Sequence, residues 1–510
     1  MPAPRATPPY VLYGVGALVA ALTLVPLGFV LVYTVVIGPQ EAWDLLVRPR
    51  VGELLFNTVR LVVFGVTLSV LIGTGCAWLV ERTDVPLRRL WHVLLAAPLA
   101  VPAFVNSFGW ISLTHRVEGF WGAVMIVTLS YYPLVYLPVA AALRGLDPAL
   151  EETAYSLHHG AMWTFLRVVV PQLRPAMLGG ALLVGLHLLA EFGALQMLRF
   201  PTFTTAIYDQ YRSSFNGPAA NMLAGVLVLF CLVLLLVEGR LRGPARYARL
   251  GSGTARVAVP RRLGRLAIPS LLALTLLVVL ALGVPTGSLV HWLRIGSSTE
   301  FPLGELASAA ATSLGLGAAA AVAATILALP VAWLAVRHRG RFSAAVERST
   351  YVANALPGIV VALAFVTVSI RVVQPVYQTF ALLLAAYSVM FLPRAVVSLR
   401  AALLQAPPVL EDVSTSLGVG RTETVRRVTL PLLLPGVGAG AALVFLAAVT
   451  ELTATLLLAP IGTDTLATEF WSRSYAAAYG AAAPYALLMV LVSVPATLLL
   501  TRASRRSRAS

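Results

Sequence analysis

The amino-acid sequence predicts an all-α polytopic membrane protein with about twelve transmembrane helices in two parallel-repeated six-helix halves. Three observations support this fold class: the composition, the recurrence of long apolar stretches and an internal repeat. Of the 510 residues, 59% are hydrophobic and only 11% are charged, whereas about a quarter of the residues in a soluble domain are charged. We therefore expect most of the chain to lie within a lipid bilayer.

Twelve apolar stretches are each long enough to cross the hydrocarbon core, which takes about 20 residues of helix. They lie at about 10–37, 54–80, 90–113, 119–142, 174–198, 219–239, 266–290, 306–336, 349–370, 376–398, 434–458 and 482–501. The first follows a short, weakly basic tail that lacks a cleavage-site pattern. It is expected to be a retained helix and not a signal peptide.

The arginines predict the orientation of these helices. All 37 basic residues are arginine, and the formal net charge is +16. With the N-terminus inside, 28 arginines fall on cytoplasmic segments and 9 on the opposite side. This bias follows the positive-inside rule and predicts that both termini are cytoplasmic. It also accounts for the basic composition without a nucleic-acid partner, and the basic tail at 502–508 is expected to lie on anionic lipid headgroups.

An internal repeat divides the chain into two halves. Trp78 and Arg82 match Trp333 and Arg337 at an offset of 255 residues. From Pro148 onward the offset is 260, through the pairs Pro148/Pro408, Pro171/Pro431, Pro175/Pro435, Glu191/Glu451 and Thr205/Thr465. An even number of helices per half preserves the orientation of the copy. We predict a first half at 1–240, a basic cytoplasmic linker at 241–265 and a second half at 266–510.

A short polar segment recurs between the membrane helices of each half. Both copies carry an acid pair, a Ser-Leu pair, a glycine and a later proline; the first has Glu151, Glu152, Gly160 and Pro171, the second Glu411, Asp412, Gly420 and Pro431. Each copy predicts a helix, over 149–158 or 409–418, with its acids at the positive end of the helix dipole. Gly160 or Gly420 would allow a tight turn with positive φ.

A second short helix is expected over about 161–169, and Pro171 or Pro431 is expected to end it and to start the next membrane helix. Such a helix–turn–helix on the cytoplasmic face could sit in a groove of a partner. An ordinary amphipathic loop is the alternative, and two copies in register weaken it.

The segment resembles the coupling motif of binding-protein-dependent ABC importer permeases. That motif reads Glu-Ala-Ala, three residues, Gly, nine residues, a hydrophobic residue, one residue and Leu-Pro. On this pattern Glu152 and Asp412 take the Glu position, His158 and Gly418 the Gly position, and Pro171 and Pro431 the Pro position. The sequence departs from the pattern where Asp412 shortens the acid, His158 replaces the glycine and Val170 precedes the proline.

Two later stretches resemble the fused iron(III)-type branch of these permeases. Glu191-Phe-Gly-Ala and the threonine-rich stretch 201–208 are similar to its first half. Glu451-Leu-Thr-Ala-Thr-Leu and the stretch 464–467 are similar to its second half, with Thr453 where proline is usual. The likeness covers essentially the whole chain, but these stretches only favour the iron or thiamine branch.

The resemblance implies a type I importer permease of the bacterial inner membrane. Two halves would form the translocation path, and each coupling segment would dock on one of two copies of an ATPase subunit. A periplasmic binding protein would deliver the solute, with ferric iron favoured and thiamine or another small solute as the alternative. The chain has no lysine, and a P-loop needs one, so ATP hydrolysis is expected on a separate polypeptide. The chain is expected to be a non-catalytic subunit without cofactors.

Ionisable residues in membrane segments are candidate functional residues. Glu191 and Glu451 occupy matching positions and could form a paired carboxylate that lines the path, or could be helix-end acids with a structural role. His187 and Glu191 share a helix face, a spacing that suits metal ligation. A transient path should not hold ferric ion tightly, so we expect no metal site there. Cys76 and Cys231 lie in apolar stretches and suit helix packing.

Several other polar and proline residues are expected to shape the membrane helices. Asn106 lies within a helix and could hydrogen-bond another helix. Pro98, Pro102 and Pro357 are expected to kink the third and ninth helices. Two other classes, an ion-coupled twelve-helix carrier and a passive channel, would also explain a duplication. Neither needs the coupling segment twice on the cytoplasmic face.

Overall fold

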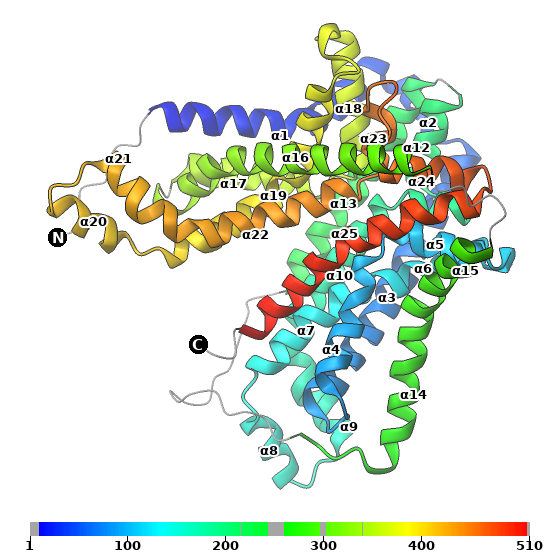
Figure 1. The fold of residues 1–510 in the computed structure, drawn as a ribbon, viewed down its shortest axis with the longest axis vertical. Helices are drawn as coiled ribbons and strands as arrows, with labels where there is room; N and C mark the ends of the chain where they lie inside the picture. Colours follow the sequence, from blue (N-terminus) through cyan, green and yellow to red (C-terminus); the bar gives the residue numbers. More distant parts are fainter. Residues whose placement is uncertain (1–9, 215, 243–259, 296–301, 339, 507–510) are drawn as a thin grey trace. The chain divides into compact units, whose positions relative to one another are not determined.

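The computed structural model describes residues 10–214, 216–242, 260–295, 302–338 and 340–506. Within these ranges the regular structure is helical (Figure 1), and strand-type pairing is limited to an isolated bridge between Thr83 and Arg261. Most of the predicted linker, residues 243–259, lies outside the described residues.

The helices follow the predicted apolar stretches closely. In chain order they are α1 (Tyr10–Ile37), α2 (Pro39–Leu46), α3 (Pro49–Arg82), α4 (Arg88–Ala96), α5 (Ala103–Ile111), α6 (Phe120–Tyr131), α7 (Pro133–Gly145), α8 (Ala149–Ser156), α9 (Ala161–Thr164), α10 (Val170–Ala190), α11 (Gly193–Met197), α12 (Phe203–Arg212), α13 (Gly217–Arg242), α14 (Ala267–Val278), α15 (Val284–Ile295), α16 (Leu303–Arg337), α17 (Arg341–Asn354), α18 (Gly358–Arg371), α19 (Phe380–Gln405), α20 (Pro408–Ser416), α21 (Arg421–Thr424), α22 (Leu430–Val449), α23 (Thr453–Leu458), α24 (Leu466–Tyr475) and α25 (Tyr479–Arg506). Short 3₁₀ turns lie at Ala97–Ala100, His115–Val117, Gly264–Leu266 and Gln374–Val376, and π turns at Phe165–Val169, Val279–Gly283 and Val425–Thr429.

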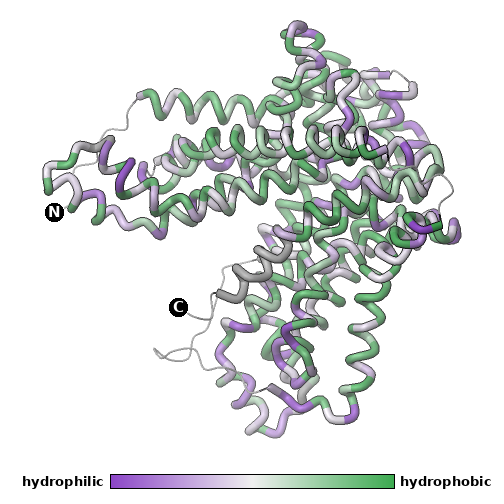
Figure 2. The backbone as a smooth tube through the Cα atoms, viewed as in Figure 1, coloured by the Kyte–Doolittle hydropathy of each residue, from purple (hydrophilic) through white to green (hydrophobic). Residues whose placement is uncertain are grey.

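The prediction of an all-α polytopic membrane protein is confirmed. Among the described residues, nine helices are long and apolar enough to span a membrane, or up to eleven if two bent pairs each count as one span. The last of the twelve predicted stretches falls in α25, whose described apolar part, Tyr479–Pro495, is shorter than a span. In Figure 2 hydrophobic residues follow the long helices, and hydrophilic residues gather towards their ends.

The two predicted proline kinks are full breaks. Arg88–Ala100 and Ala103–Ile111 meet at 90°, and Arg341–Ala353 and Gly358–Arg371 meet at 105°. Pro102 and Pro357 are the N-cap residues of α5 and α18. A proline lacks the N–H of a helical bond and disfavours helical backbone in the residue before it, and Val101, before Pro102, is extended. The predicted inter-helix hydrogen bond is also present, since Asn106 Nδ2 donates to Ser130 Oγ of α6 at 2.8 Å.

The chain folds into two compact units, and each draws segments from both sequence halves. One unit contains residues 1–45, 216–228 and 301–472, and the other contains 46–215, 229–300 and 473–510. Within the first, α1 packs on α16, α17 and α18. Within the second, α15 packs on α5 and α25. The first membrane helix of each sequence half therefore belongs to the compact unit built mainly from the other half.

Each unit is built around three closely packed helices. They are α3, α7 and α10 in one unit and α16, α19 and α22 in the other. Glycine allows a close approach, because a Cβ on Gly73 of α3 would lie 2.9 Å from the carbonyl oxygen of Tyr132 and from the amide nitrogen of Tyr136. The polar segments connect the second and third helices of these triplets, so the packed core fixes both ends of each segment.

Candidate functional site

Both repeated polar segments begin with a short helix and a turn, as predicted (Figure 1). The four-residue helices that follow the turns continue into the next membrane helices. We call residues 149–164, with α8 and α9, the first polar segment, and residues 408–424, with α20 and α21, the second polar segment. Helices α8 and α20 end at Ser156 and Ser416, two residues before the predicted ends. The acids lie near the start of each first helix, where the helix dipole favours them.

The tight turn differs from the prediction in the residue that takes the left-handed conformation. His158 has φ of 62° and Gly418 has φ of 83°, whereas Gly160 and Gly420 do not have positive φ. The turn closes α8 with hydrogen bonds from His159 N to Ala154 O at 3.1 Å and from His158 N to Tyr155 O at 3.0 Å. This is the Schellman arrangement, which places its left-handed residue directly after the C-cap.

The second polar segment ends α20 with the same pair of bonds, from Val419 N to Ser414 O and from Gly418 N to Thr415 O. The motif glycine is therefore the left-handed residue of a helix C-cap. The first segment holds a histidine in that conformation.

The prolines do not end a helix, which corrects the second part of the prediction. The chain stays helical from α9 into α10, and a candidate span runs over Met162–Ala190. A π turn at Phe165–Val169 precedes Pro171, and Val170 N donates to Phe165 O. A proline lacks the N–H of an α-helical bond, and the wider π turn places it in the first turn of the following helix. The second half repeats this with Val425–Thr429 before Pro431.

One acid of each pair is anchored by an arginine at the end of the first core helix of the same half, α3 or α16. Arg337 of α16 donates to Glu411 Oε1 at 2.7 Å and to the carbonyl oxygen of Ala406 at 2.9 Å. Arg82 of α3 lies 3.1 Å from Glu151 Oε1 and donates to the carbonyl oxygen of Leu146 at 3.4 Å. We call Glu151 and Glu411 the inner acids. The duplicated anchor ties each polar segment to a core helix.

The two anchors are not equally tight. Glu411 Oε1 also accepts a hydrogen bond from Thr429 Oγ1 at 3.1 Å, whereas the matching residue in the first half is Val169. The contact of Arg82 with Glu151 is a close ion pair without hydrogen-bond alignment. Burial raises the pKa of Glu151 above its ordinary value, Arg82 opposes this by attraction, and the neighbouring Glu152 adds to it.

The second acid of each pair faces away from the anchor. Glu152 and Asp412, the outer acids, are exposed. In the same segments Leu157 and Leu417 are 65% and 78% exposed, although large apolar side chains favour burial. Each polar segment therefore presents an exposed carboxylate and an exposed leucine at matching positions, which is chemistry suited to a protein partner.

Sequence reasoning missed the anchoring role of Arg82 and Arg337. The signal was present, because both arginines match at the repeat offset of 255 residues and each precedes a polar segment. They were interpreted only as markers of the repeat and of membrane orientation. Their offset differs by five residues from that of the acids, which obscured the pairing.

Glu191 and Glu451 take the same local role in the two units. Each follows a core helix at a break, and its Oε1 accepts a hydrogen bond from the backbone N–H three residues on, at 2.9 Å from Ala194 and 3.0 Å from Ala454. Their own carbonyl oxygens each accept from a threonine hydroxyl at 2.7 Å. Both carboxylates thus cap a short helix after a break, in line with the structural alternative.

The neighbours of these two acids differ. The Tyr131 hydroxyl donates to Glu191 Oε2, while Arg394 interacts electrostatically with Glu451. His187 packs its ring against Tyr131 at 5.3 Å, and its Nδ1 lies 2.8 Å from the carbonyl oxygen of Leu183. In the parts of the chain that the structure describes, no group of three metal-ligating side chains is gathered.

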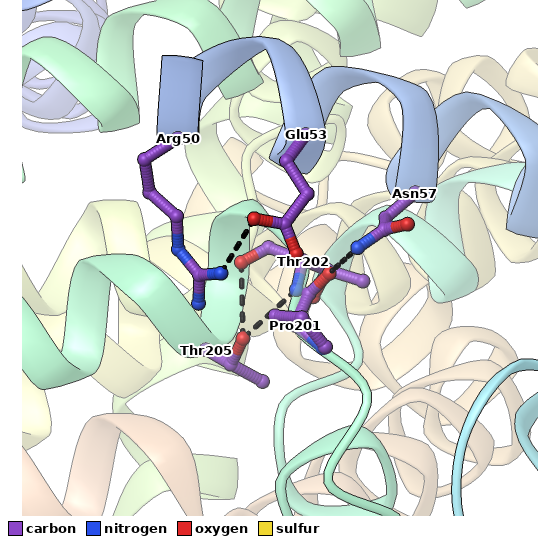
Figure 3. A network of polar contacts seen from close by, with 6 residues as sticks. All are labelled: Arg50, Glu53, Asn57, Pro201, Thr202 and Thr205. Carbon is purple, nitrogen blue, oxygen red and sulfur yellow. Dashed lines mark hydrogen bonds and ion pairs between the residues drawn. The ribbon is translucent and has the colours of Figure 1, made fainter. Parts of the chain in front are cut away.

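The threonine-rich stretches dock on the starts of the core helices (Figure 3). Asn57 Nδ2 of α3 donates to the Pro201 carbonyl at 3.0 Å, and Thr202 N donates to Thr205 Oγ1 at 2.9 Å. The second half repeats this cap with Thr465 N and Thr468 Oγ1, also at 2.9 Å. The predicted match of Thr205 with Thr465 is therefore wrong. Thr202 is the counterpart of Thr465, because the connection before the cap is longer in the second half.

A polar cavity of about 620 Å³ lies beside this stretch within one unit. Among the charged groups that line it, burial raises the pKa of Asp209, opposed by a hydrogen bond from Gln196 and by Arg50. The cavity was not predicted, because its lining comes from six separate segments. It is lined by Arg50, Phe108, Ile111, His115, Glu118, Gln196, Met197, Arg199, Phe200, Pro201, Thr205, Asp209, Ser474, Tyr475, Ala477 and Tyr479.

The duplicated helical core and the duplicated polar segments define a multi-pass membrane protein with two similar halves. The chain belongs to the family of binding-protein-dependent transport system inner membrane components, whose model matches residues 65–242 and 324–509. It is a fused two-domain permease with the type I permease fold present twice, located in the inner membrane.

Its relatives include permeases for different solutes. The chain is 39% identical to the Fe(3+)-transport system permease protein FbpB 2 of Haemophilus influenzae, over 96% of this chain and 98% of that protein. It is 23% identical to the ferric transport system permease protein FbpB of Actinobacillus pleuropneumoniae, over 89% and 72% of the two chains. The sulfate transport system permease protein CysT of Escherichia coli is 27% identical over 42% of this chain and 86% of its own.

Proposed function

We propose that this permease forms the translocation path of an ABC importer and that its two polar segments couple it to separate ATPase subunits. The observation that supports this most is the duplicated construction of the segments. In both, an arginine of a core helix anchors the inner acid, while an outer acid and a leucine remain exposed. An anchored surface segment can transmit the movement of a bound partner to the core helix that holds it.

The ATPase is a separate polypeptide in this proposal. The chain has no lysine, and the phosphate-binding P-loop requires one. Two segments with the same backbone geometry support two copies of one ATPase subunit. A periplasmic binding protein delivers the solute to the opposite face, in keeping with the family description.

Ferric iron is the favoured cargo. The relative that matches this chain nearly end to end is named as an Fe(3+) transport permease, whereas the sulfate permeases match only part of it. Thiamine or another small solute remains the alternative. Uptake of radiolabelled ferric iron and of thiamine into proteoliposomes that contain the permease, its ATPase and its binding protein would decide between them.

The orientation and the path acids belong to the same proposal. The arginine bias supports a cytoplasmic location for both termini and both polar segments, which a cysteine at Ser252 tests with a membrane-impermeant thiol reagent. Labelling in intact cells would overturn this orientation. If Glu191 and Glu451 assist a cation, the double change Glu191→Gln and Glu451→Gln should slow uptake while basal ATPase activity is kept. Loss of folded protein would instead establish the helix-capping role.

The experiment for coupling reverses the charge of the outer acids. With Glu152→Lys and Asp412→Lys together, we expect normal membrane insertion, weak binding of the ATPase and loss of transport. The matched control is Ser156→Ala with Ser416→Ala, at exposed positions of the same helices. Normal transport by the lysine double variant would show that these segments do not couple the permease to an ATPase.

A further inference from the structure

The described end of the linker between the halves is bound to the first polar segment through Arg82. Arg261 N donates to the carbonyl oxygen of Arg82 at 2.9 Å, and Asp84 N donates to the carbonyl oxygen of Arg261 at 3.0 Å. Leu263 N then donates to Asp84 Oδ1 at 2.8 Å. These three bonds hold residues 261–263 alongside residues 82–84, where Thr83 and Val85 are buried.

The linker also contacts the polar segment directly. The Arg261 guanidinium lies 5.8 Å from the centre of the Tyr155 ring of α8, within the range of a cation–π attraction. The Arg82 side chain also lies 3.1 Å from Glu151 of α8. The backbone of Arg82 thus binds the linker while its side chain binds the polar segment.

The second half supports its polar segment in a different way. Arg337 is held by aligned hydrogen bonds to Glu411 and Ala406, and Glu411 is held further by Thr429. The first half has Val169 in place of Thr429, and its ion pair lacks hydrogen-bond alignment. The linker contacts lie on the polar segment whose own anchor is weaker.

We infer that residues 261–263 form a latch that positions the first polar segment, with Asp84 and Arg261 as positioning residues. The latch compensates for the looser anchor of this segment. The linker that joins the two halves therefore helps to hold the first polar segment in position. Its consequence for ATPase coupling rests on the proposed function, whereas its effect on the order of α8 does not.

Hydrogen–deuterium exchange of the full-length permease in nanodiscs tests the latch without any ATPase or solute. Asp84→Ala removes the acceptor for Leu263 N, and Arg261→Pro removes the donor to Arg82 O. Loss of one such bond should raise the exchange of α8 amides about 5-fold, while α20 amides stay unchanged. Asp84→Asn keeps an acceptor oxygen and should restore slow exchange, and Arg262→Ala, at an exposed neighbouring position, should have no effect.

The outcomes separate the latch from a general loss of stability. Faster exchange in α8 alone, with rescue by Asp84→Asn, supports the latch. Unchanged exchange in α8 for both Asp84→Ala and Arg261→Pro would overturn it, and so would equal acceleration of α8 and α20. A transport assay of the same variants then tests coupling. If α8 exchanges faster but transport is normal, the inference that the latch positions α8 stands, and the coupling role of the first segment is contradicted.

Discussion

The two polar segments share a backbone and differ in their surfaces. Both have the same helix, the same left-handed cap and an arginine anchor at the matching position. The first exposes aromatic side chains, with His159 stacked on Trp163 at 3.7 Å. At the position of Trp163 the second has Glu423, which pairs with Arg426 and Arg427.

This difference indicates which features serve a common partner. If two copies of one ATPase bind the two segments, the essential contacts must be those that both segments present. These are the outer acids and the exposed leucines, Leu157 and Leu417. The aromatic and charged surfaces are then free to differ, and the anchors must hold both segments with similar geometry.

The largest expected effect comes from reversing an anchor. Arg337→Glu places two carboxylates together and leaves the Ala406 carbonyl without its donor, so we expect transport to be abolished with the protein still inserted. Arg82→Glu should follow the same direction with a smaller loss, because its contacts are longer. Transport assays of both variants measure the difference.

A charge swap gives the control for the anchor. Arg337→Glu combined with Glu411→Arg restores an ion pair and should recover part of the transport that Arg337→Glu loses. No recovery by the swap would mean that the arginine acts through something other than the inner acid.

The exposed leucines should come next in size. A large apolar residue that fills a partner's pocket typically contributes about 1–2 kcal/mol of binding, or roughly 10-fold in affinity. Leu157→Asp and Leu417→Asp should therefore weaken ATPase binding by similar factors, as measured by titration of the ATPase onto permease in nanodiscs. Strongly unequal factors would argue against two equivalent contacts.

The cap residues predict a smaller and unequal effect. Gly418→Leu places a β-carbon at φ of 83°, which costs roughly 1–2 kcal/mol, although the space around it is open. His158→Leu replaces a side chain that already bears this strain. We expect Gly418→Leu to loosen α20 in hydrogen exchange more than His158→Leu loosens α8, and equal loosening would contradict the strain argument.

The smallest effect concerns the pH dependence of the first anchor. Burial raises the pKa of Glu151, so the folded segment binds a proton more tightly than an unfolded one. Its contribution to stability is then greatest below the ordinary carboxyl pKa and declines as pH rises through the raised value. As pH rises above the ordinary carboxyl pKa of about 4.3, α8 should lose protection in the wild type relative to Glu151→Gln, and parallel profiles would contradict this assignment.

The sequence predicted the membrane helices, the repeat and the polar segments because each rests on a local pattern. Apolar length shows where a helix crosses, and register between copies shows where the polar segments lie. The left-handed residue was misplaced because Gly160 and Gly420 are present in both segments, whereas only the second segment has a glycine, Gly418, at the left-handed position. The Thr205 match failed because a longer connection at 459–464 shifts the register, which identity of residue type alone does not reveal.

The sequence did not predict which helices pack against one another. An apolar stretch records that a helix is buried in lipid or protein, but not which helix it touches. The assignment of α1 to the unit of α16, and of α15 to the unit of α5, therefore emerged only from the fold. The anchors were hidden for the same reason, since Arg82 and Glu151 lie 69 positions apart in the chain.

The composition of the compact units has a consequence for biogenesis. Helix α25 packs on α4 and α15 within a unit that otherwise comes mainly from the first half. A ribosome makes α4 early and α25 last. The compact unit is therefore incomplete until almost the whole chain has been translated and inserted. A nascent chain truncated before residue 473 therefore exposes unfinished helix surfaces in its first half, a form that membrane quality control can recognise and degrade.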